Sequence, residues 1–163
     1  MLTTLQPKKF AIPQGSFAIV ASRYNAKYVD AMVQAAQLEL KKAGAKTVWV
    51  ARVPGAFEIP AVAALLARQR PHCSAIICLG VILRGETAHA QQISDAVSAG
   101  LVQLQIQHAL PIVHEVLLLE NEAQAIVRCL DKNHNRGTEA AQTALEMARV
   151  MASLRQRPSK EKR

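Results

Sequence analysis

Four short segments of the sequence combine side chains that could bind and react with a flat, phosphate-bearing molecule. They lie at residues 23–25, 53–60, 84–89 and 114–115. Tyr24 and Phe57 offer flat apolar faces on which an aromatic ring can stack. Thr87 precedes an expected helix, whose first backbone N–H groups attract anions. His89 lies beside this anion site and has the side chain best suited to proton transfer near neutral pH.

Glycines and arginines add two further features to this set of residues. Gly55 and Gly85 would allow the backbone to approach a ligand closely. Arg128 and Arg136 supply permanently charged donors for a phosphate or a carboxylate. These residue types alone predict a domain that binds a planar, phosphate-bearing small molecule, and they leave the identity of that molecule open.

Alternating hydrophobic patterns predict the elements that must position these residues. Apolar runs typical of strands lie at 16–22, 47–50, 75–83 and 112–118. Helical spacing, together with a proline that fits a first turn, predicts helices near 29–40, 60–70, 90–108, 122–130 and 141–151. Gly44 is expected to end the first helix. The polar segment 131–138 is expected to be a loop.

The alternation of strands with helices favours right-handed βαβ units and a parallel sheet. We therefore expect an α/β fold, a three-layer α/β/α sandwich around a mostly parallel sheet of about four strands. The run at 75–83 is apolar on both faces, as in a central strand covered by helices on both sides. Ligands of such sheets bind beyond the carboxyl ends of the strands. The site is therefore expected in the loops at 23–25, 53–58, 84–89 and 113–116.

The chain has the size and composition of one globular domain. Of its 163 residues, half are hydrophobic and 20% are charged, which excludes a disordered or collagen-like chain. Its longest apolar run, at 76–83, is far shorter than the ~20 residues of a membrane-spanning helix. The first fifteen residues lack the apolar segment of a secretory signal. The three cysteines have no metal-ligand spacing, so we expect a cytoplasmic protein with reduced, buried thiols and no membrane contact.

The formal net charge of +8 is concentrated at one end of the chain. Residues 149–163 contain six Lys or Arg and a single acid. Nucleic-acid surfaces usually interleave basic and aromatic residues, whereas aromatic residues make up only 4% of this chain. We therefore interpret the basic end as a solvated tail and do not expect nucleic-acid binding. The glycine-rich motifs of dinucleotide and nucleoside triphosphate sites are absent.

Several longer motifs resemble the lumazine synthase family, which acts at the penultimate step of riboflavin biosynthesis. They are VPGAFEIP at 53–60, GVILRGETAH at 80–89, EN at 120–121, R at 128, NRGTEAA at 135–141 and ALEMA at 144–148. Their order and separations match the family, and the resemblance covers about residues 14–154. It implies a flavodoxin-like domain at 14–154, with an N-terminal arm at 1–13 and a basic C-terminal tail at 155–163.

The resemblance implies a condensation of two small molecules that needs neither a cofactor nor a metal ion. In this family 5-amino-6-(D-ribitylamino)uracil and 3,4-dihydroxy-2-butanone 4-phosphate give 6,7-dimethyl-8-ribityllumazine, phosphate and water. His89 would be the catalytic proton carrier. The residues implied in binding the pyrimidine and the ribityl chain are Tyr24, Ala56, Phe57, Glu58, Val81, Ile82, Leu83 and His114. Those implied in binding the phosphate are Glu86, Thr87 and Arg128.

Some positions depart from the family pattern. His114 stands where Phe is most common, and it could pack on the pyrimidine or bond to the ring edge. Glu115 follows where Gly is common, and Leu118-Leu119 replaces the usual Thr-Thr pair. A carboxylate at position 86 would repel a phosphate, so we expect the Glu86 side chain to point away and only its N–H to face the ligand.

The resemblance also implies partners. It implies a homopentamer in which His114 closes the site of a neighbouring subunit, a shell of 60 subunits, and contact with riboflavin synthase. The basic tail would attract polyanions or fill the interior of such a shell.

Two alternative functions remain open. One is a catalytically idle paralogue that binds flavins or lumazines without depending on His89. The other is a nucleic-acid binder, which the concentration of charge in the tail disfavours.

Overall fold

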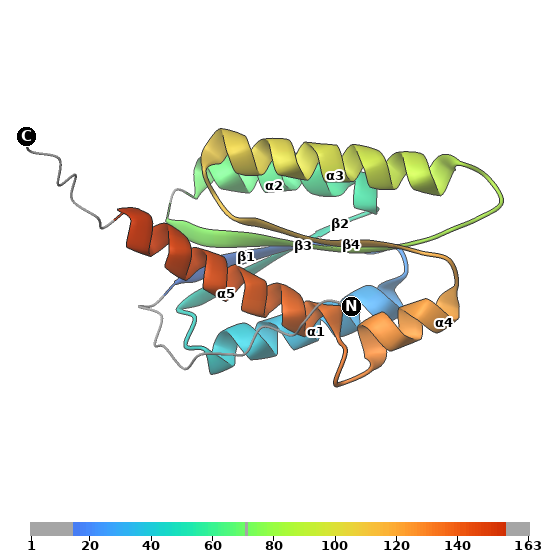
Figure 1. The fold of residues 1–163 in the computed structure, drawn as a ribbon, viewed down its shortest axis with the longest axis horizontal. Coiled ribbons are helices and arrows are strands. Elements are labelled where there is room, and N and C mark those ends of the chain that lie inside the picture. Colours follow the sequence, from blue (N-terminus) through green and yellow to red (C-terminus); the bar gives the residue numbers. More distant parts are fainter. Residues whose placement is uncertain (1–14, 71, 156–163) are drawn as a thin grey trace, which may run out of the picture.

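Four parallel strands form the middle layer of the molecule (Figure 1). The computed structural model describes residues 15–70 and 72–155. The strands are β1 (Ser16–Ser22), β2 (Thr47–Val53), β3 (Cys73–Leu83) and β4 (Ile112–Leu119). They pair in the order β2-β1-β3-β4, and every pairing is parallel. Nearly every residue of the central strand β3 is buried. The predicted four-stranded parallel sheet is confirmed.

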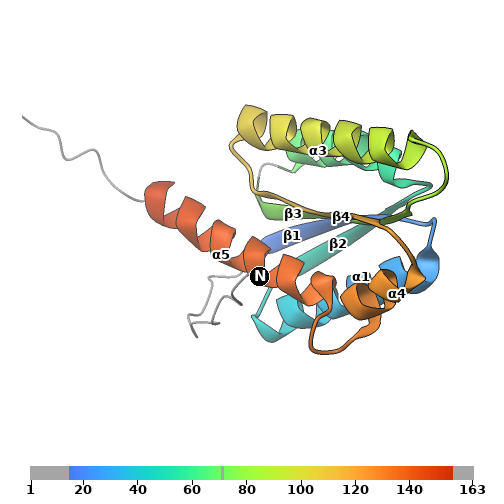
Figure 2. The same cartoon turned by 45° about the vertical axis from the view of Figure 1, so that its right-hand side comes forward.

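Helices cover both faces of this sheet (Figures 1 and 2). On one face lie α2 (Ile59–Gln69) and α3 (His89–His108). On the other lie α1 (Ala26–Lys42), α4 (Glu122–Ala125) and α5 (Arg136–Arg155). A 3₁₀ turn at Ala56–Glu58 leads into α2, and a π-helical segment at Ile126–Leu130 follows α4. This arrangement confirms the predicted three-layer sandwich.

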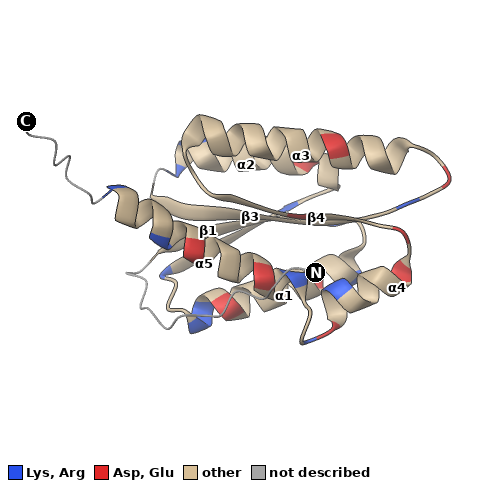
Figure 3. Cartoon of the chain, in the orientation of Figure 1, with Lys and Arg blue, Asp and Glu red and all other residues tan. Residues whose placement is uncertain are grey.

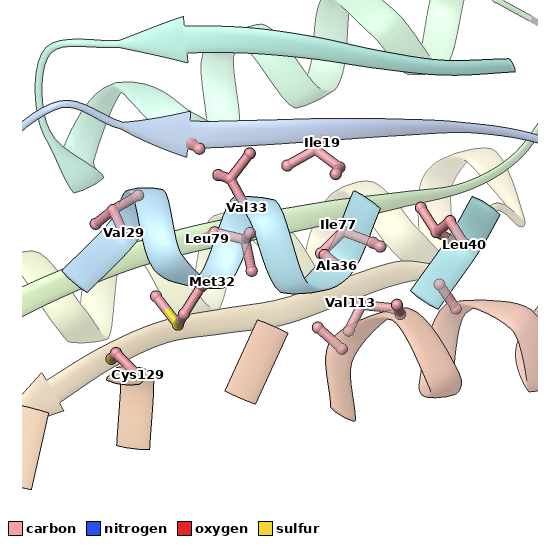
Figure 4. Close-up of a cluster of buried hydrophobic side chains, with 14 of the residues drawn as sticks. Ile19, Val29, Met32, Val33, Ala36, Leu40, Ile77, Leu79, Val113 and Cys129 are labelled. Carbon is pink, nitrogen blue, oxygen red and sulfur yellow. The ribbon is translucent and has the colours of Figure 1, made fainter. Parts of the chain in front are cut away.

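Each face of the sheet contributes to its own hydrophobic cluster. Strand β1 shows why, because successive side chains of a strand point to opposite faces. Phe17 and Ile19 are fully buried in the cluster beneath α1 and α5. Figure 4 shows part of this cluster, with Ile19 labelled. Ala18 and Val20 are fully buried in the second cluster, beneath α2 and α3. Packing on both faces of the sheet therefore holds the strands, and with them the loops at their ends, in position.

Helices α1 and α5 approach each other to backbone contact. A Cβ atom built on Gly137 would overlap the carbonyl group of Met32 in α1. Met32 is itself fully buried in the cluster beneath these helices (Figure 4). Because a backbone carbonyl inside a helix has no freedom to move aside, only glycine fits at position 137.

Two predicted elements differ from the structure. The loop predicted at 131–138 ends at Asn135, because α5 already begins at Arg136. Asn135 caps this helix: its side-chain oxygen accepts a hydrogen bond from the Gly137 N–H at 2.8 Å, and its Nδ2 donates to the Cys129 carbonyl. The helix predicted at 122–130 is divided into α4 and the π-helical segment.

The remaining boundaries agree with the sequence to within a few residues. The first strand matches at both ends, whereas β2 continues to Val53, three residues beyond its prediction. Gly44 follows α1 with a φ of +81°, in the left-handed region expected of a helix-ending glycine. The predicted arm at 1–13, and the predicted tail beyond Arg155, lie outside the described residues. Within the described ranges, no helix is long and apolar enough to cross a membrane.

Candidate active site

A pocket of about 820 Å³ opens at the carboxyl edge of the sheet, beside the first turns of α3. Its size is typical of small-molecule sites. The pocket is lined by Tyr24, Asn25, Gly55, Ala56, Phe57, Glu58, Val81, Ile82, Leu83, His89, Gln92, Ile93 and Ala96. The loops that follow β1, β2 and β3 meet here because all the strands run in the same direction.

The pocket brings together eight of the twelve residues that the family resemblance implies in catalysis or substrate binding. These eight are Tyr24, Ala56, Phe57, Glu58, Val81, Ile82, Leu83 and His89. The other four, Glu86, Thr87, His114 and Arg128, do not line it in this chain. The first two follow β3 in the loop that leads to α3, whereas the last two belong to β4 and to the π-helical segment.

Two aromatic rings stand open at the mouth of the pocket. Tyr24 is 69% exposed and Phe57 is 60% exposed. The Tyr24 ring lies over Gly55, where a Cβ atom would come within 3.1 Å of Tyr24 Cδ2. The Tyr24 N–H also donates to the Pro54 carbonyl at 3.0 Å, which holds this residue against the loop after β2. The Tyr24 ring is thus held against the loop after β2, and both rings are accessible to a planar ligand.

Side-chain hydrogen bonds preform the walls of the pocket. Asn25 adopts a left-handed conformation with a φ of 57°, which asparagine tolerates better than most residues. Its Nδ2 donates to the Val81 carbonyl at 2.8 Å and so ties the loop after β1 to β3. In the loop after β2, Glu58 Oε2 accepts a hydrogen bond from the Gly55 N–H at 2.8 Å. The other carboxylate oxygen of Glu58 is then available to a ligand.

One face of α3 forms the remaining wall. His89, Gln92, Ile93 and Ala96 line the pocket, and they follow one another at the i, i+3, i+4, i+7 spacing of a single helix face. Of these four residues, only His89 was predicted from the sequence. The helical spacing counted from His89 is the signal that would have found them.

The loop between β3 and α3 lies open beside the pocket, with a basic and an acidic position along it (Figure 3). Glu86 and Thr87 are both exposed. Thr87 Oγ1 accepts a long hydrogen bond of 3.4 Å from the His89 N–H, at the first residue of α3. The amino end of the 20-residue helix α3, with its electropositive N–H groups, therefore faces this loop.

His114 and Glu115 lie inside β4, which confirms the strand predicted at 112–118 and shows that the ligand-binding loop expected at 113–116 was wrong. Their side chains point to opposite faces of the sheet. His114 Nε2 lies 2.8 Å from Ser98 Oγ of α3, and His114 Nδ1 accepts a hydrogen bond from the Val116 N–H at 3.2 Å. Burial lowers the pKa of His114 below its ordinary value.

Glu115 points to the opposite face and pairs with Arg136 of α5. Arg136 Nε and Nη2 each donate to one carboxylate oxygen of Glu115 at 3.1 Å, and Nη1 pairs with Glu139. Burial raises the pKa of the Glu115 carboxyl, and the charge of Arg136 opposes that rise. Arg136 is therefore directed at carboxylates of its own chain, which corrects its prediction as a donor for the phosphate or carboxylate of a ligand.

Arg128 is exposed on the π-helical segment, on the side of the sheet that α1 and α5 cover. The two residues before it, Ile126 and Val127, are 46% and 53% exposed. Together these three residues form a small exposed surface of mixed apolar and basic character. In this chain, that surface is separate from the residues that line the pocket.

The cysteines are buried, as predicted, and none of them has reactive surroundings. Cys73, Cys78 and Cys129 are free thiols. Burial raises the pKa of all three thiols, that of Cys129 to about 11, so they are protonated near neutral pH. Across residues 15–70 and 72–155, no group of three His, Cys, Asp or Glu side chains is placed to hold a metal ion.

Comparison with known proteins identifies the family. The profile of the 6,7-dimethyl-8-ribityllumazine synthase family matches residues 14–152. The protein of that name from Xanthomonas oryzae pv. oryzae (strain PXO99A) is 38% identical over 144 residues, which cover 87% of this chain and 93% of that protein. Its counterpart from Stenotrophomonas maltophilia (strain R551-3) is 39% identical over 140 residues, or 85% and 90% of the two chains. This chain belongs to the 6,7-dimethyl-8-ribityllumazine synthase family.

Proposed function

We propose that the pocket beside α3 is where this chain carries out the reaction of its family. By family, the chain is a transferase of riboflavin biosynthesis. It condenses 5-amino-6-(D-ribitylamino)uracil with 3,4-dihydroxy-2-butanone 4-phosphate to 6,7-dimethyl-8-ribityllumazine, phosphate and water. The observation that carries the placement is that His89 shares one pocket with seven residues suited to hold the pyrimidine substrate.

In this proposal the ribitylaminouracil occupies the part of the pocket between the aromatic mouth and β3. Its flat ring stacks on Tyr24, which is exposed and held by the loop after β2. Ala56, Phe57 and Glu58 hold the ribityl chain and the ring edge, with the free Glu58 oxygen accepting from a hydroxyl group. The apolar side chains of the opposite wall are those of Val81, Ile82 and Leu83.

The butanone phosphate lies with its phosphate group at the amino end of α3. Thr87 and the backbone N–H groups of the loop after β3 donate to the dianion, which the helix dipole also favours. The exposed Glu86 directs its side chain to solvent and contributes its N–H. Arg128 supplies a permanent positive charge to the leaving phosphate.

His89 relays protons between the two substrates. Imine formation, elimination of phosphate and ring closure each move a proton, and one imidazole near neutral pH can take up and return each of them. The location of His89 in the pocket lining and at the first residue of α3 supports a position of the imidazole between the two substrates. Holding the two substrates together contributes much of the remaining acceleration, a positioning effect of up to ~7–11 kcal/mol.

A neighbouring subunit completes the site in this proposal. Arg128 and His114 do not line the pocket of their own chain, which supports a site that a second copy completes. The exposed Ile126 and Val127 beside Arg128 support a contact at that surface. We accordingly propose a homopentamer, which could assemble further into a shell of 60 subunits. Riboflavin synthase would be the partner that consumes the lumazine, in a reducing cytoplasm that keeps buried thiols intact.

The proposal is tested with the purified full-length protein and both substrates, by following lumazine fluorescence against a no-enzyme control. Turnover well above the control is expected, and His89→Ala should lower kcat roughly 10²- to 10⁴-fold. His108→Ala is the matched control, because it removes a histidine from the far end of the same helix. Binding without turnover would favour the idle paralogue, and equal rates in the His89→Ala and His108→Ala variants would refute the role of His89.

A further inference from the structure

We propose that Arg84 is a positioning residue for the phosphate loop, defined here as residues 85–88, and that it controls affinity for the phosphorylated substrate without contacting it. The inference rests on the proposed function, in which this loop and the amino end of α3 bind the phosphate. Arg84 directly follows β3 and precedes the loop. Two of its guanidinium nitrogens donate to side chains of its own chain, Glu120 and Gln91, and are thereby directed away from a ligand.

The phosphate loop has little packing of its own. A Cβ atom built on Gly85 would meet no other atom within 4 Å. Glu86 and Thr87 are both exposed, and the hydrogen bond between the Thr87 hydroxyl and the His89 N–H is long, at 3.4 Å. A segment with so few internal contacts takes its conformation from the two points at which it is anchored.

Arg84 holds both anchoring points at once. Its backbone N–H donates to the Leu119 carbonyl at 2.8 Å, which continues the pairing of β3 with β4. Its Nε donates to Glu120 Oε1 at 2.9 Å, just beyond β4. Its Nη2 donates to Gln91 Oε1 at 2.8 Å, in the first turn of α3. One guanidinium group therefore fixes the start of the loop relative to the helix that ends it and carries His89.

The partners of Arg84 are held in their turn. Gln91 Nε2 donates to Asp95 Oδ1 at 2.8 Å, one helical turn further along α3. The Glu120 N–H donates to Gln124 Oε1 at 3.0 Å, in α4. The network therefore runs from α4 on one face of the sheet to α3 on the other and passes through a single side chain.

This network has little to contribute to the stability of the fold. The side chains of Arg84 and Glu120 are 35% and 58% exposed, and ion pairs so open to water contribute little free energy of unfolding. The planar guanidinium fork is nevertheless suited to holding two acceptors in fixed directions, which the single ammonium group of lysine cannot do. Arg84 therefore contributes mainly to the position of the phosphate loop, and only little to the free energy of unfolding.

The test compares three variants of the full-length protein in steady-state kinetics with each substrate varied in turn. Arg84→Gln removes the fork, Arg84→Lys keeps the charge without the fork, and Arg68→Gln removes one exposed positive charge from the end of α2. We expect Arg84→Gln to lower kcat/KM for the butanone phosphate by about 10- to 100-fold, since a shift of ~1 Å can cost roughly 100-fold. The effect should appear mainly in KM, and the inhibition constant of inorganic phosphate should rise in parallel.

The KM for the ribitylaminouracil should change by less than about twofold in the same variant. Arg84→Lys should recover only a minor part of the loss, and Arg68→Gln should behave like the unaltered protein. Full recovery by Arg84→Lys would assign the effect to charge and overturn the inference, as would an equal rise of both KM values or no change at all. Absence of turnover in the unaltered protein would instead overturn the proposed function, and this inference with it.

Discussion

Ser98 Oγ lies 2.8 Å from Nε2 of His114, and this contact joins the middle of α3 to β4. The serine hydroxyl donates its own proton to the Ser94 carbonyl at 2.8 Å, and His114 Nδ1 accepts from the Val116 N–H at 3.2 Å. The pattern assigns the imidazole a single proton, on Nε2. A second proton would sit on Nδ1 and face the Val116 N–H. The hydrogen bonds and the burial of the ring thus both favour neutral His114.

Acid should weaken the fold through His114. Because the folded pKa lies below the unfolded value of about 6.5, the unfolded chain takes up this proton first as the pH falls. The contribution of His114 to stability is complete above about pH 6.5 and is lost as the pH falls toward the folded pKa. Urea unfolding at several pH values between 7.5 and 5 measures this loss. The loss should be smaller in His114→Phe, and identical pH profiles would contradict the assignment.

Gly137→Ala should destabilise the protein by about 3 kcal/mol, at the upper end for overpacked sites, because its methyl group would overlap the Met32 carbonyl. Gly85→Ala is the matched control, since no atom lies within 4 Å of its Cβ position. The control should change the free energy of unfolding by less than about 0.5 kcal/mol. Thermal or urea unfolding of both variants provides the comparison. Equal stabilities would mean that α1 and α5 can separate without cost.

Glu115→Ala should cost about 3 kcal/mol, the lower end for breaking a buried ion pair, because Arg136 keeps its second partner Glu139. Glu146→Ala breaks the more exposed pair between Glu146 and Arg149 on the same helix and should cost less than about 1 kcal/mol. Chemical denaturation of the two variants measures the difference. Similar losses would show that burial of the first pair has no energetic consequence.

Tyr24→Ala should raise KM for the ribitylaminouracil by roughly 5- to 150-fold, the equivalent of about 1–3 kcal/mol for a lost base-stacking contact. Tyr24→Phe retains the flat ring and should stay within about twofold of the unaltered protein. Steady-state kinetics with saturating butanone phosphate makes the measurement. A large effect of Tyr24→Phe would assign the binding energy to the hydroxyl group in place of the ring face.

Glu86→Ala tests the direction of the Glu86 side chain. With the carboxylate turned to solvent, KM for the butanone phosphate should stay within about twofold of the unaltered value. Kinetics at two salt concentrations measures this, since screening weakens any direct repulsion. A marked fall in KM that is largest at low salt would show that the carboxylate faces the phosphate.

The fold was predictable because its elements depend on local patterns. The apolar run at 16–22 became β1 without change, and the alternation of strands and helices predicted the parallel sheet. The start of α5 at Arg136 was predictable too, although the polar composition of 131–138 led to the prediction of a loop there. Asn135 is a favoured helix-capping residue, and Glu139 follows in the first turn of the helix.

The surroundings of His114 and Glu115 were not predictable in the same way. Both residues interrupt an apolar strand with polar side chains, and their partners Ser98 and Arg136 lie 16 and 21 residues away in sequence. A local pattern identifies a strand but not the helix residue that faces it. Burial of such residues is acceptable only because those partners exist. The apolar run at 112–118 therefore predicted the strand, whereas the two polar residues within it were wrongly assigned to a ligand-binding loop.

The pocket residues that lie in the loops were predicted from the sequence, whereas most of those on α3 were not. Motifs marked the loops after β1, β2 and β3, whereas Gln92, Ile93 and Ala96 have no distinctive chemistry and enter only through the helical repeat. The network of Arg84 was missed because it joins three segments that are adjacent only in the folded chain. Residues such as Arg128, which act across two copies in our proposal, depend on quaternary contacts that no periodicity within one chain encodes.

The end of α5 has a practical consequence for attaching the protein to a surface. Arg155 Nη2 donates to the Ala109 carbonyl at 3.1 Å, which places the end of this helix beside the segment that enters β4. The pocket lies at the opposite edge of the sheet, and a strand of eight residues separates the two edges by roughly 25 Å. A linker joined after α5 would therefore leave each chain at the end of the sheet opposite to its pocket, about one strand length from the bound substrates.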